Sequence, residues 1–263
     1  MRFASLASGS QGNSLVVEAR AQAAGTPSRV LLDCGLTLRE TVRRLARLGL
    51  APEDIDAVVV THEHDDHIGS AFAFAAAHGA TVCLTRGTLR AVEEAGRTQA
   101  DAPIRLIDGR TRFSVGALEI DPFTVPHDAR EPVQVAFGDG SRRLGVLTDL
   151  GAPTVHVRDK LADCDALVLE CNHDLGLLEA GAYPKWLKDR ISGPLGHLDN
   201  GAAAALLASI GGNRLQHVIA AHLSARNNRP ALARAALAGA LGCAEDWIGV
   251  ATQAGGFDWR TLE

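Results

Sequence analysis

The sequence is poor in aromatic residues and has no cysteine pattern that would hold a small fold together. Phe, Trp and Tyr make up 4% of the 263 residues, so any core is built mainly from aliphatic side chains. The five cysteines are an odd number and include no C-x-x-C pair, which argues against a disulfide framework and against a cysteine zinc ribbon. The expectation is therefore a reduced, cytoplasmic protein.

Long hydrophobic runs and a strong net charge are also missing. No apolar run approaches the roughly 18 residues that a membrane-spanning helix needs, and the first residues lack the apolar stretch of a signal peptide, so we expect no membrane attachment. The formal net charge of −5 offers no overall attraction for nucleic acid, although a local basic patch remains compatible with it. The composition, 46% hydrophobic and 22% charged, is that of a globular protein with a sizeable core. Its most informative feature is the set of ten histidines.

Strand and helix patterns alternate along the chain, with a β-rich middle. They occur twice over, and no Pro/Ser-rich linker or long charge run separates the two occurrences, so we predict one domain, residues 1–263, built from two related αβ halves. The expected strands are 2–7, 14–19, 29–33, 55–60, 81–84, 117–123, 132–137, 144–147, 166–169 and 217–221. The expected helices are 37–49, 68–78, 155–161, 184–191, 200–210 and one that begins at residue 230.

The strongest chemical signal is His62-x-His64-x-Asp66-His67, directly after an apolar strand. A loop at the end of a strand can point several imidazoles and a carboxylate into one cleft. Four metal-type ligands within six residues exceed the needs of one tetrahedral ion with an open position, which favours two neighbouring ions. The alternative is a solvated turn that is rich in acid and histidine.

This run resembles the H-x-H-x-D-H signature of the metallo-β-lactamase superfamily, whose fold is a four-layer αβ/βα sandwich of the α+β type with a two-metal site at its edge. The resemblance extends over nearly the whole chain. The superfamily's other motifs follow in the expected order, at Asp33, His127, Asp149 and His222.

The resemblance implies a role for each of these residues. One divalent ion would be held by His62, His64 and His127. The other would be held by Asp66, His67 and His222, with Asp149 bridging the two ions and Asp33 orienting the histidine loop without binding metal. A hydroxide between the ions would be the nucleophile, oriented by Asp66 and Asp149. The ligand types admit zinc, manganese or iron.

Further local motifs narrow the resemblance to the YycJ (WalJ) branch, which is associated with phosphodiesterase and nuclease activity, including 5′-to-3′ exonuclease action on double-stranded DNA. One departure is Asp199, because the branch usually has Ser there; if that Ser contacts phosphate, Asp199 would repel it. The motifs are Ser8-Gly-Ser-x-Gly-Asn13, His127-Asp-Ala129, Thr148-Asp-Leu-Gly151, Asn172-His-Asp174, Tyr183-Pro-x-x-Leu-Lys188, Gly196-His-Leu-x-Asn200 and His222-Leu-Ser-x-x-Asn-Asn228.

The chemistry favours a dinuclear phosphodiesterase, most simply a nuclease, over a β-lactam hydrolase. The Asp149 carboxylate supplies a hard oxygen bridge, and a two-ion clamp stabilises both the attacking and the leaving oxygen of a displacement at phosphorus. Two alternatives stay open. One is a phosphodiesterase for small cyclic phosphates, which the net charge and the few stacking aromatics favour; the other is a non-catalytic metal-binding scaffold. The partner is accordingly nucleic acid, with DNA expected, or a small phosphodiester, and the oligomeric state leaves no trace in the sequence.

A last group of residues is predicted to act on the substrate. His197 and His173 sit in short polar clusters and would protonate the leaving group or bind phosphate, or else would hold their own loops by hydrogen bonds. The other predicted substrate ligands, for each of which ordinary loop chemistry is the alternative, are Ser10, Asn13, Asn172, Asn200, Asn227 and Asn228.

Overall fold

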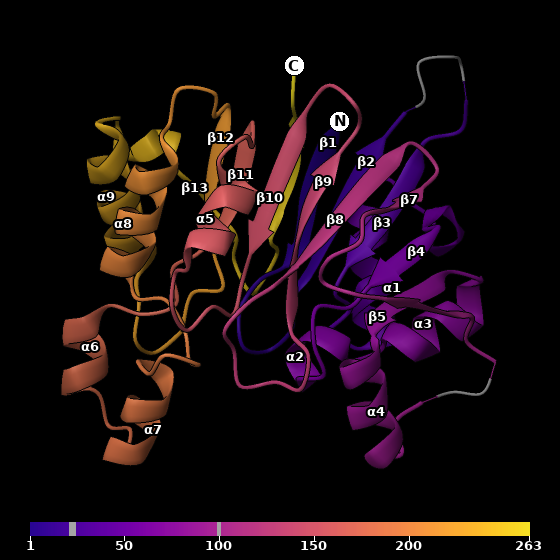
Figure 1. Ribbon diagram of the computed structural model, residues 1–263, viewed down its shortest axis with the longest axis horizontal. Coiled ribbons are helices and arrows are strands. Elements are labelled where there is room, and N and C mark those ends of the chain that lie inside the picture. Colours follow the sequence, from indigo (N-terminus) through magenta and orange to yellow (C-terminus); the bar gives the residue numbers. More distant parts are fainter. Residues whose placement is uncertain (21–24, 99–100) are drawn as a thin grey trace.

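In the computed structural model, which describes residues 1–20, 25–98 and 101–263, two β-sheets pack face to face and helices cover both outer faces (Figure 1). Each sheet has seven strands. The interior between them is filled by buried side chains from both sheets, among them Phe3, Val30, Phe137 and Ile219. The predicted four-layer αβ/βα sandwich is confirmed.

The first sheet is built from the first half of the chain and from the last strand. Its elements are β1 (Arg2–Ala7), β2 (Ser14–Ala19), β3 (Ser28–Leu32), α1 (Leu38–Arg47), the 3₁₀ helix η1 (Pro52–Asp54), β4 (Ala57–Val59), α2 (Asp65–Ile68), α3 (Ala71–His78), β5 (Thr81–Thr85), α4 (Arg86–Glu94), β6 (Ile104–Ile107) and β14 (Phe257–Thr261). The strand order is β14-β1-β2-β3-β4-β5-β6. β3 to β6 run parallel, since helices lie between them in the chain.

The second sheet has the order β13-β12-β11-β10-β9-β8-β7. Its elements are β7 (Phe113–Val115), β8 (Leu118–Thr124), β9 (Val133–Gly138), β10 (Arg143–Leu147), α5 (Val155–Leu161), β11 (Ala166–Glu170), α6 (Leu175–Ala180), α7 (Lys185–Ile191), α8 (Asn200–Ile210), β12 (His217–Ala221), α9 (Pro230–Leu241), the 3₁₀ helix η2 (Glu245–Trp247) and β13 (Gly249–Val250). β7 to β10 form antiparallel pairs, and β10 to β13 run parallel.

Each outer layer packs through small and aliphatic side chains. On the first sheet, α1 and α3 bury Leu45 and Phe74. On the second, α5, α8 and α9 bury residues such as Leu161, Leu207 and Leu237. The short helices α6 and α7 lie apart from these layers, at the lower left of Figure 1. The helices of the two outer layers therefore do not cover the edge of the sandwich at which the parallel strands end.

Several elements differ from the sequence-based prediction. The helix expected at 68–78 begins only at Ala71, and the separate short helix α2 precedes it. Gly69 between them has a φ of 26°, and a Cβ there would lie 2.6 Å from the Cys34 carbonyl oxygen, so the chain breaks at a position that only glycine fits. Helix α4, which carries polar and charged residues on most positions, was not predicted. The C-terminal strand β14 was missed as well, since it forms only by pairing antiparallel with β1, far away in sequence.

The parallel strands bring their carboxyl ends to one edge of the sandwich. β3 leads into Asp33, β4 into the loop that starts at Thr61, β10 into Asp149 and β12 into His222. Because both sheets contribute, residues from the two halves meet at this edge. Within the described part of the chain, no helix combines the length and the apolar character that crossing a bilayer demands.

Glu18 on β2 gives a test of the first sheet. Its buried carboxylate accepts hydrogen bonds from Arg2 Nε and Arg29 Nε, both at 2.7 Å, on the two neighbouring strands. Burial disfavours the charged form, but the two arginines outweigh it and hold the pKa of Glu18 below its ordinary value of 4.5. A lowered pKa stabilises the fold above about pH 4.5, and this contribution is lost as the pH falls through the folded-state pKa.

We therefore expect Glu18→Gln to lower the free energy of unfolding by about 1–2 kcal/mol at pH 7. The difference should shrink below pH 4, as measured by urea unfolding across pH. Glu119→Gln is the matched control, because Glu119 pairs with Arg112 at a side-chain exposure of 48% and should matter little. An equal loss for Glu18→Gln at pH 3.5 and pH 7 would contradict the linkage.

Candidate metal centre

The loop from Thr61 to His67 is fixed by Asp33, which follows β3. Asp33 Oδ1 accepts hydrogen bonds from the backbone N of Thr61 at 2.8 Å and from its Oγ1 at 3.0 Å. Asp33 Oδ2 lies 2.7 Å from His67 Nδ1. With the proton on Nδ1, His67 keeps Nε2 free as an acceptor or ligand. Asp33 therefore sits behind the histidine loop, which is the place that the family resemblance implies.

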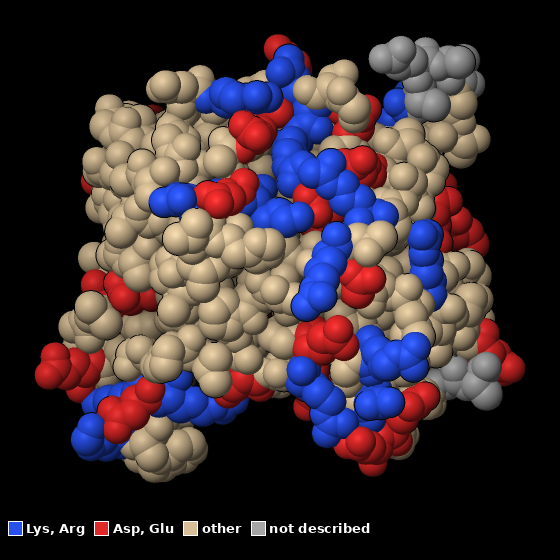
Figure 2. Space-filling model, viewed as in Figure 1, with Lys and Arg blue, Asp and Glu red and all other residues tan. Residues whose placement is uncertain are grey.

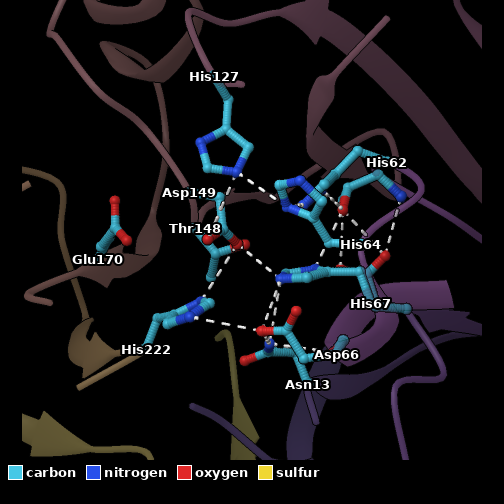
Figure 3. A network of polar contacts seen from close by, with 12 residues as sticks. Asn13, His62, His64, Asp66, His67, His127, Thr148, Asp149, Glu170 and His222 are labelled. Atoms are coloured by element: carbon cyan, nitrogen blue, oxygen red, sulfur yellow. Dashed lines mark hydrogen bonds and ion pairs between the residues drawn. The ribbon is translucent and has the colours of Figure 1, made fainter. Parts of the chain in front are cut away.

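Three imidazoles converge on one side of the cavity (Figure 3). His64 Nδ1 lies 3.0 Å from His62 Nε2 and 3.3 Å from His127 Nε2. His62 and His64 come from the loop after β4, whereas His127 follows β8 in the second sheet. The second nitrogen of His127, Nδ1, lies 3.1 Å from the carbonyl oxygen of Gly196, which holds the ring with Nε2 facing the other two. These three nitrogens form a trigonal ligand set.

A second set lies next to it, and Asp149 faces both (Figure 3). Asp149 Oδ2 lies 2.7 Å from His67 Nε2 and 3.2 Å from His222 Nδ1, and Asp149 Oδ1 lies 4.0 Å from His127 Nε2. Asp66 Oδ2 lies 3.6 Å from His67 Nε2 and 3.8 Å from His222 Nε2. All seven residues predicted as metal ligands are thus gathered at one edge of the sandwich.

The backbone at this edge is strained. Among the described residues, only Asp33, Asp149 and His222 combine a side chain with a positive φ, at 59°, 55° and 53°. Each follows a strand end within two residues. The left-handed conformation costs a non-glycine residue about 1 kcal/mol or more. Packing elsewhere in the fold must therefore supply the energy that holds these three side chains in position.

The site has the properties that a bound cation requires. Neither the buried Asp149 Oδ2 nor the buried His222 Nδ1 has a hydrogen bond of good geometry with any described residue. An orphaned buried carboxylate oxygen is costly, and a divalent cation satisfies it together with the facing imidazoles. The residues present therefore fit divalent metal ions. Their nitrogen and oxygen donors do not select one metal.

The ionisation of the histidines points the same way. Burial lowers the pKa of His62 well below its ordinary range, so this ring is neutral at pH 7. Burial acts in the same direction on His67, but Asp149, Asp33 and Asp66 outweigh it and raise the pKa of His67 well above its ordinary range. The pKa of His222 is also raised, because Asp149 outweighs burial. The carboxylates thus stabilise positive charge beside them, either as protons on the histidines or as bound metal ions. Protonation of the histidines therefore competes with metal binding.

Glu170, at the end of β11, is a site residue that the sequence analysis missed. Its side chain is fully buried, and its Oε2 accepts the backbone N of Leu150 at 2.8 Å and of Leu198 at 3.1 Å. Its Oε1 lies 2.8 Å from His197 Nδ1. Glu170 therefore braces the loops that carry Asp149 and His197. The available signal was a carboxylate at the end of an apolar strand, the same pattern that identified Asp33.

His197 lies at the cavity wall, where it was expected. Its Nδ1 faces Glu170 and also lies 3.2 Å from Asp149 Oδ1, which leaves Nε2 for other contacts. Burial alone would lower the pKa of His197, but the two carboxylates outweigh it and raise the pKa well above its ordinary range. The cavity has a volume of about 310 Å³ and is open to solvent. Its lining includes Ser10, His64, Asp65, Asp66, Asp128, Asp149, Arg190, Ile191, Gly196, His197 and His222.

His173 is not brought to this cavity. It is fully buried, and neither ring nitrogen has a hydrogen bond with a described residue. Burial lowers its pKa, which favours the neutral ring. The lining of the cavity does not include His173, so its catalytic role stays a prediction that the geometry does not support.

The predicted substrate-binding asparagines are also used inside the fold, and of that group only Ser10 lines the cavity. Asn200 and Asn228 are buried and exchange two side-chain hydrogen bonds, at 3.0 and 2.9 Å. Asn172 Nδ2 donates to the His222 carbonyl oxygen at 3.1 Å, and Asn227 is buried beneath the loop before α7. Loop amides satisfy buried backbone groups here, a use that the sequence does not separate from substrate binding.

Asn13 supports ligands instead of facing substrate. Its Nδ2 lies 3.3 Å from Asp66 Oδ2 and 3.1 Å from His67 Nε2, and its Oδ1 accepts the backbone N of Gly9 at 2.8 Å. Asp199, the departure from the branch pattern, is the N-cap of α8: its Oδ1 accepts the backbone N of Gly201 at 2.7 Å and of Ala202 at 3.0 Å. Ser and Asp both serve as N-caps, so this difference changes a helix cap and not the cavity wall.

Comparison with known proteins agrees with this geometry. A family model described as a β-lactamase superfamily domain matches residues 28–222. The chain belongs to the metallo-β-lactamase superfamily, as the motif order predicted. The solved structure of the metallo-β-lactamase fold protein YhfI from Bacillus subtilis superposes with a TM-score of 0.74 over 99% of both chains, at 14% identity.

Two relatives are similar over most of their length. The exodeoxyribonuclease WalJ of Streptococcus pneumoniae serotype 2 is 32% identical over 252 residues, which covers 95% of this chain and 91% of that protein. The exodeoxyribonuclease YycJ of Bacillus anthracis is 34% identical over 236 residues, covering 89% and 86%. The predicted resemblance to the YycJ (WalJ) branch is confirmed.

The packing around Asp66 allows a test of the metal centre in which none of the predicted ligands is mutated. A Cβ at Gly35 would lie 1.8 Å from the Asp66 carbonyl oxygen. We expect Gly35→Ala to displace Asp66, to lower the metal content measured by elemental analysis, and to destabilise the fold by about 1–3 kcal/mol. Gly239→Ala, at an exposed position of α9, is the control, because no atom lies within 4 Å of its added Cβ. Unchanged metal content in folded Gly35→Ala would contradict the assignment of Asp66 as a metal ligand.

Proposed function

We propose that this protein is a metal-dependent nuclease that hydrolyses phosphodiester bonds in DNA from a strand end. The observation that carries the proposal is the convergence of five imidazoles and two carboxylates in two neighbouring sets, at the floor of a cavity open to solvent. The similarity to two exodeoxyribonucleases over most of the chain supports DNA as the substrate class. The buried free cysteines are consistent with work in a reducing compartment, and we place the protein in the cytoplasm.

The chain's own residues define where metal would bind. His62, His64 and His127 would hold one divalent ion, Asp66, His67 and His222 would hold the second, and Asp149 would contact both. Bound ions of this kind act as Lewis acids toward a phosphodiester and make water a nucleophile at neutral pH. Asp33 and Asn13 hold His67 and Asp66 in place, so they are positioning residues. Zinc, manganese and iron all remain compatible with these donors.

His197 is the residue placed to act on the leaving oxygen. Glu170 and Asp149 hold Nδ1, so Nε2 is the nitrogen left for the substrate. A proton held at Nε2 can pass to the oxygen that departs from phosphorus. Glu170 acts through His197 and is a positioning residue. Ser10, on the opposite loop, is placed to donate a hydrogen bond to a phosphate oxygen.

A second hollow beside the cavity favours a polymeric anion over a small cyclic phosphate. It has a volume of about 520 Å³ and is lined by Arg86, Arg90 and Arg130, with Leu106 among its apolar lining. The acidic residues of this lining already have partners. Glu94 pairs with Arg130, Glu131 accepts a hydrogen bond from the backbone N of Gly87 at 2.6 Å, and Asp108 accepts hydrogen bonds from two backbone N–H groups. Among the described residues, neither Arg86 nor Arg90 has an ion-pair partner, so both are available for backbone phosphates.

The loop of residues 128–131 joins the two hollows. Asp128 lines the metal cavity, and Arg130 and Glu131 line the arginine hollow. The backbone N of Arg130 also donates to Glu63 Oε1 at 2.7 Å, beside the ligand His64. A single DNA strand can therefore contact both hollows, whereas a mononucleotide bound in the metal cavity would leave the arginine hollow empty.

The test is hydrolysis by the metal-loaded protein of single-stranded and duplex oligodeoxynucleotides, the same strands as RNA, and cyclic nucleotides. We expect DNA to be the best substrate and His62→Ala to lower kcat/KM by about a hundredfold or more. The matched control is His156→Ala, an exposed histidine on α5, which should retain metal and activity. Faster turnover of a cyclic nucleotide than of DNA would establish the small-substrate alternative, and equal metal content in His62→Ala and wild type would contradict the ligand assignment.

A further inference from the structure

Helix α7 is a surface element without a packing role. None of its seven residues is buried, and in Figure 1 it lies with α6 below the main layers. Two side-chain contacts hold it: Lys188 Nζ donates to the Glu179 carbonyl oxygen at 2.5 Å, and Arg190 Nη2 lies 2.7 Å from Asp128 Oδ2. A short helix that buries nothing contributes little to stability, because most helix stability in proteins comes from a buried face.

Trp186 on this helix is 67% exposed, the highest value among the large hydrophobic side chains of the described residues. The chain has only three tryptophans, so an indole ring in solvent is an unusual use of one. Large exposed aromatics mark binding surfaces, and a flat π-face suits stacking on a nucleobase.

The charges around Trp186 are those of an anion-binding surface. Lys185, Lys188 and Arg190 lie on the same helix with one acid, Asp189, which pairs with Lys185 at 2.8 Å. Figure 2 shows blue side chains at the lower left, over α7, with red ones among them. Arg226, from the loop after His222, lies over the Tyr183 ring at 5.8 Å and adds a cation at the start of the helix. We define the α7 surface as Tyr183, Lys185, Trp186, Lys188, Arg190 and Arg226.

The α7 surface is continuous with the metal cavity. Arg190 lines the cavity, as does Ile191 at the end of α7. The carbonyl oxygen of Ile191 accepts the backbone N of His197 at 2.8 Å, so the helix end is joined directly to the residue beside the leaving oxygen. A helix of seven residues is about 10 Å long. This length matches about three nucleotides at the stacked spacing of 3.4 Å.

We propose that the α7 surface binds unpaired nucleotides of the DNA strand that is being cut, with a base stacked on Trp186 and backbone phosphates on Lys185, Lys188 and Arg190. The inference rests on the proposed nuclease function and adds where the strand lies and that it is single-stranded there. Stacking on an exposed ring requires a base that is free of its partner, which a blunt duplex does not offer. A protein partner is disfavoured, because protein interfaces are depleted in lysine.

The test measures DNA binding by the metal-loaded full-length protein, with a phosphorothioate single strand that resists cleavage. Single-stranded DNA should quench tryptophan fluorescence in wild type, and Trp186→Ala should lose most of the quenching and bind about tenfold more weakly. Trp186→Phe should recover much of the affinity, because it restores an aromatic face. The matched control is Trp247→Ala, which removes a tryptophan 40% exposed on η2 and should bind as wild type does.

The outcomes separate this inference from the proposed function. If Trp186→Ala binds the single strand within twofold of wild type, or a blunt duplex binds wild type more tightly than the single strand, the α7 surface is not the DNA path. If Trp186→Ala instead changes the sedimentation of the protein without changing DNA affinity, the surface serves self-association and the inference is overturned. Failure of wild type to cut any DNA contradicts the nuclease function, whatever the binding result.

Discussion

A chain of charged contacts through His67 ties the two halves of the molecule together. Nδ1 of this fully buried ring lies 2.7 Å from Asp33 of the first half, and Nε2 lies 2.7 Å from Asp149 of the second. Asp149 in turn contacts His222, beyond β12. Each member is buried, so each is costly unless the next is correctly placed. The positions of the strand ends in both sheets are therefore constrained by one ring.

The strain at this edge follows from the same constraint. A strand alternates its side chains between the two faces of a sheet, and neither face points to the edge. Asp33, Asp149 and His222 reach the edge because each adopts a left-handed backbone conformation just past its strand. The surrounding sheets, with an aliphatic interior that is almost fully buried, supply the stability that offsets this strain. Two of the predicted metal ligands, Asp149 and His222, and the positioning residue Asp33 thus lie where the backbone conformation is locally unfavourable.

The sequence predicts the parts of this structure that depend on short-range patterns. Short continuous apolar runs mark the central strands, and the ligands are recognisable because H-x-H-x-D-H and the later motifs keep their order. The sequence does not predict the features that depend on contacts between residues far apart in the chain. β14 exists through pairing with β1, and Asn200 and Asn228 look like surface loop residues until each is seen to bond the other. Glu170 escaped notice because it stands just before the Asn172-His-Asp174 motif and is not part of it, although its position at the end of a buried strand resembles that of Asp33.

The charges at the cavity also explain why a net charge of −5 is compatible with a polyanionic substrate. Four carboxylates line the cavity: Asp65, Asp66, Asp128 and Asp149. Asp65 is paired with Arg97 and Asp128 with Arg190, which leaves Asp66 and Asp149 without a lysine or arginine partner among the described residues. Two divalent ions would more than neutralise this pair. Bound metal would then favour the entry of phosphate as well as the chemistry there, because it adds positive charge at the floor of the cavity, beside Arg190 in the lining.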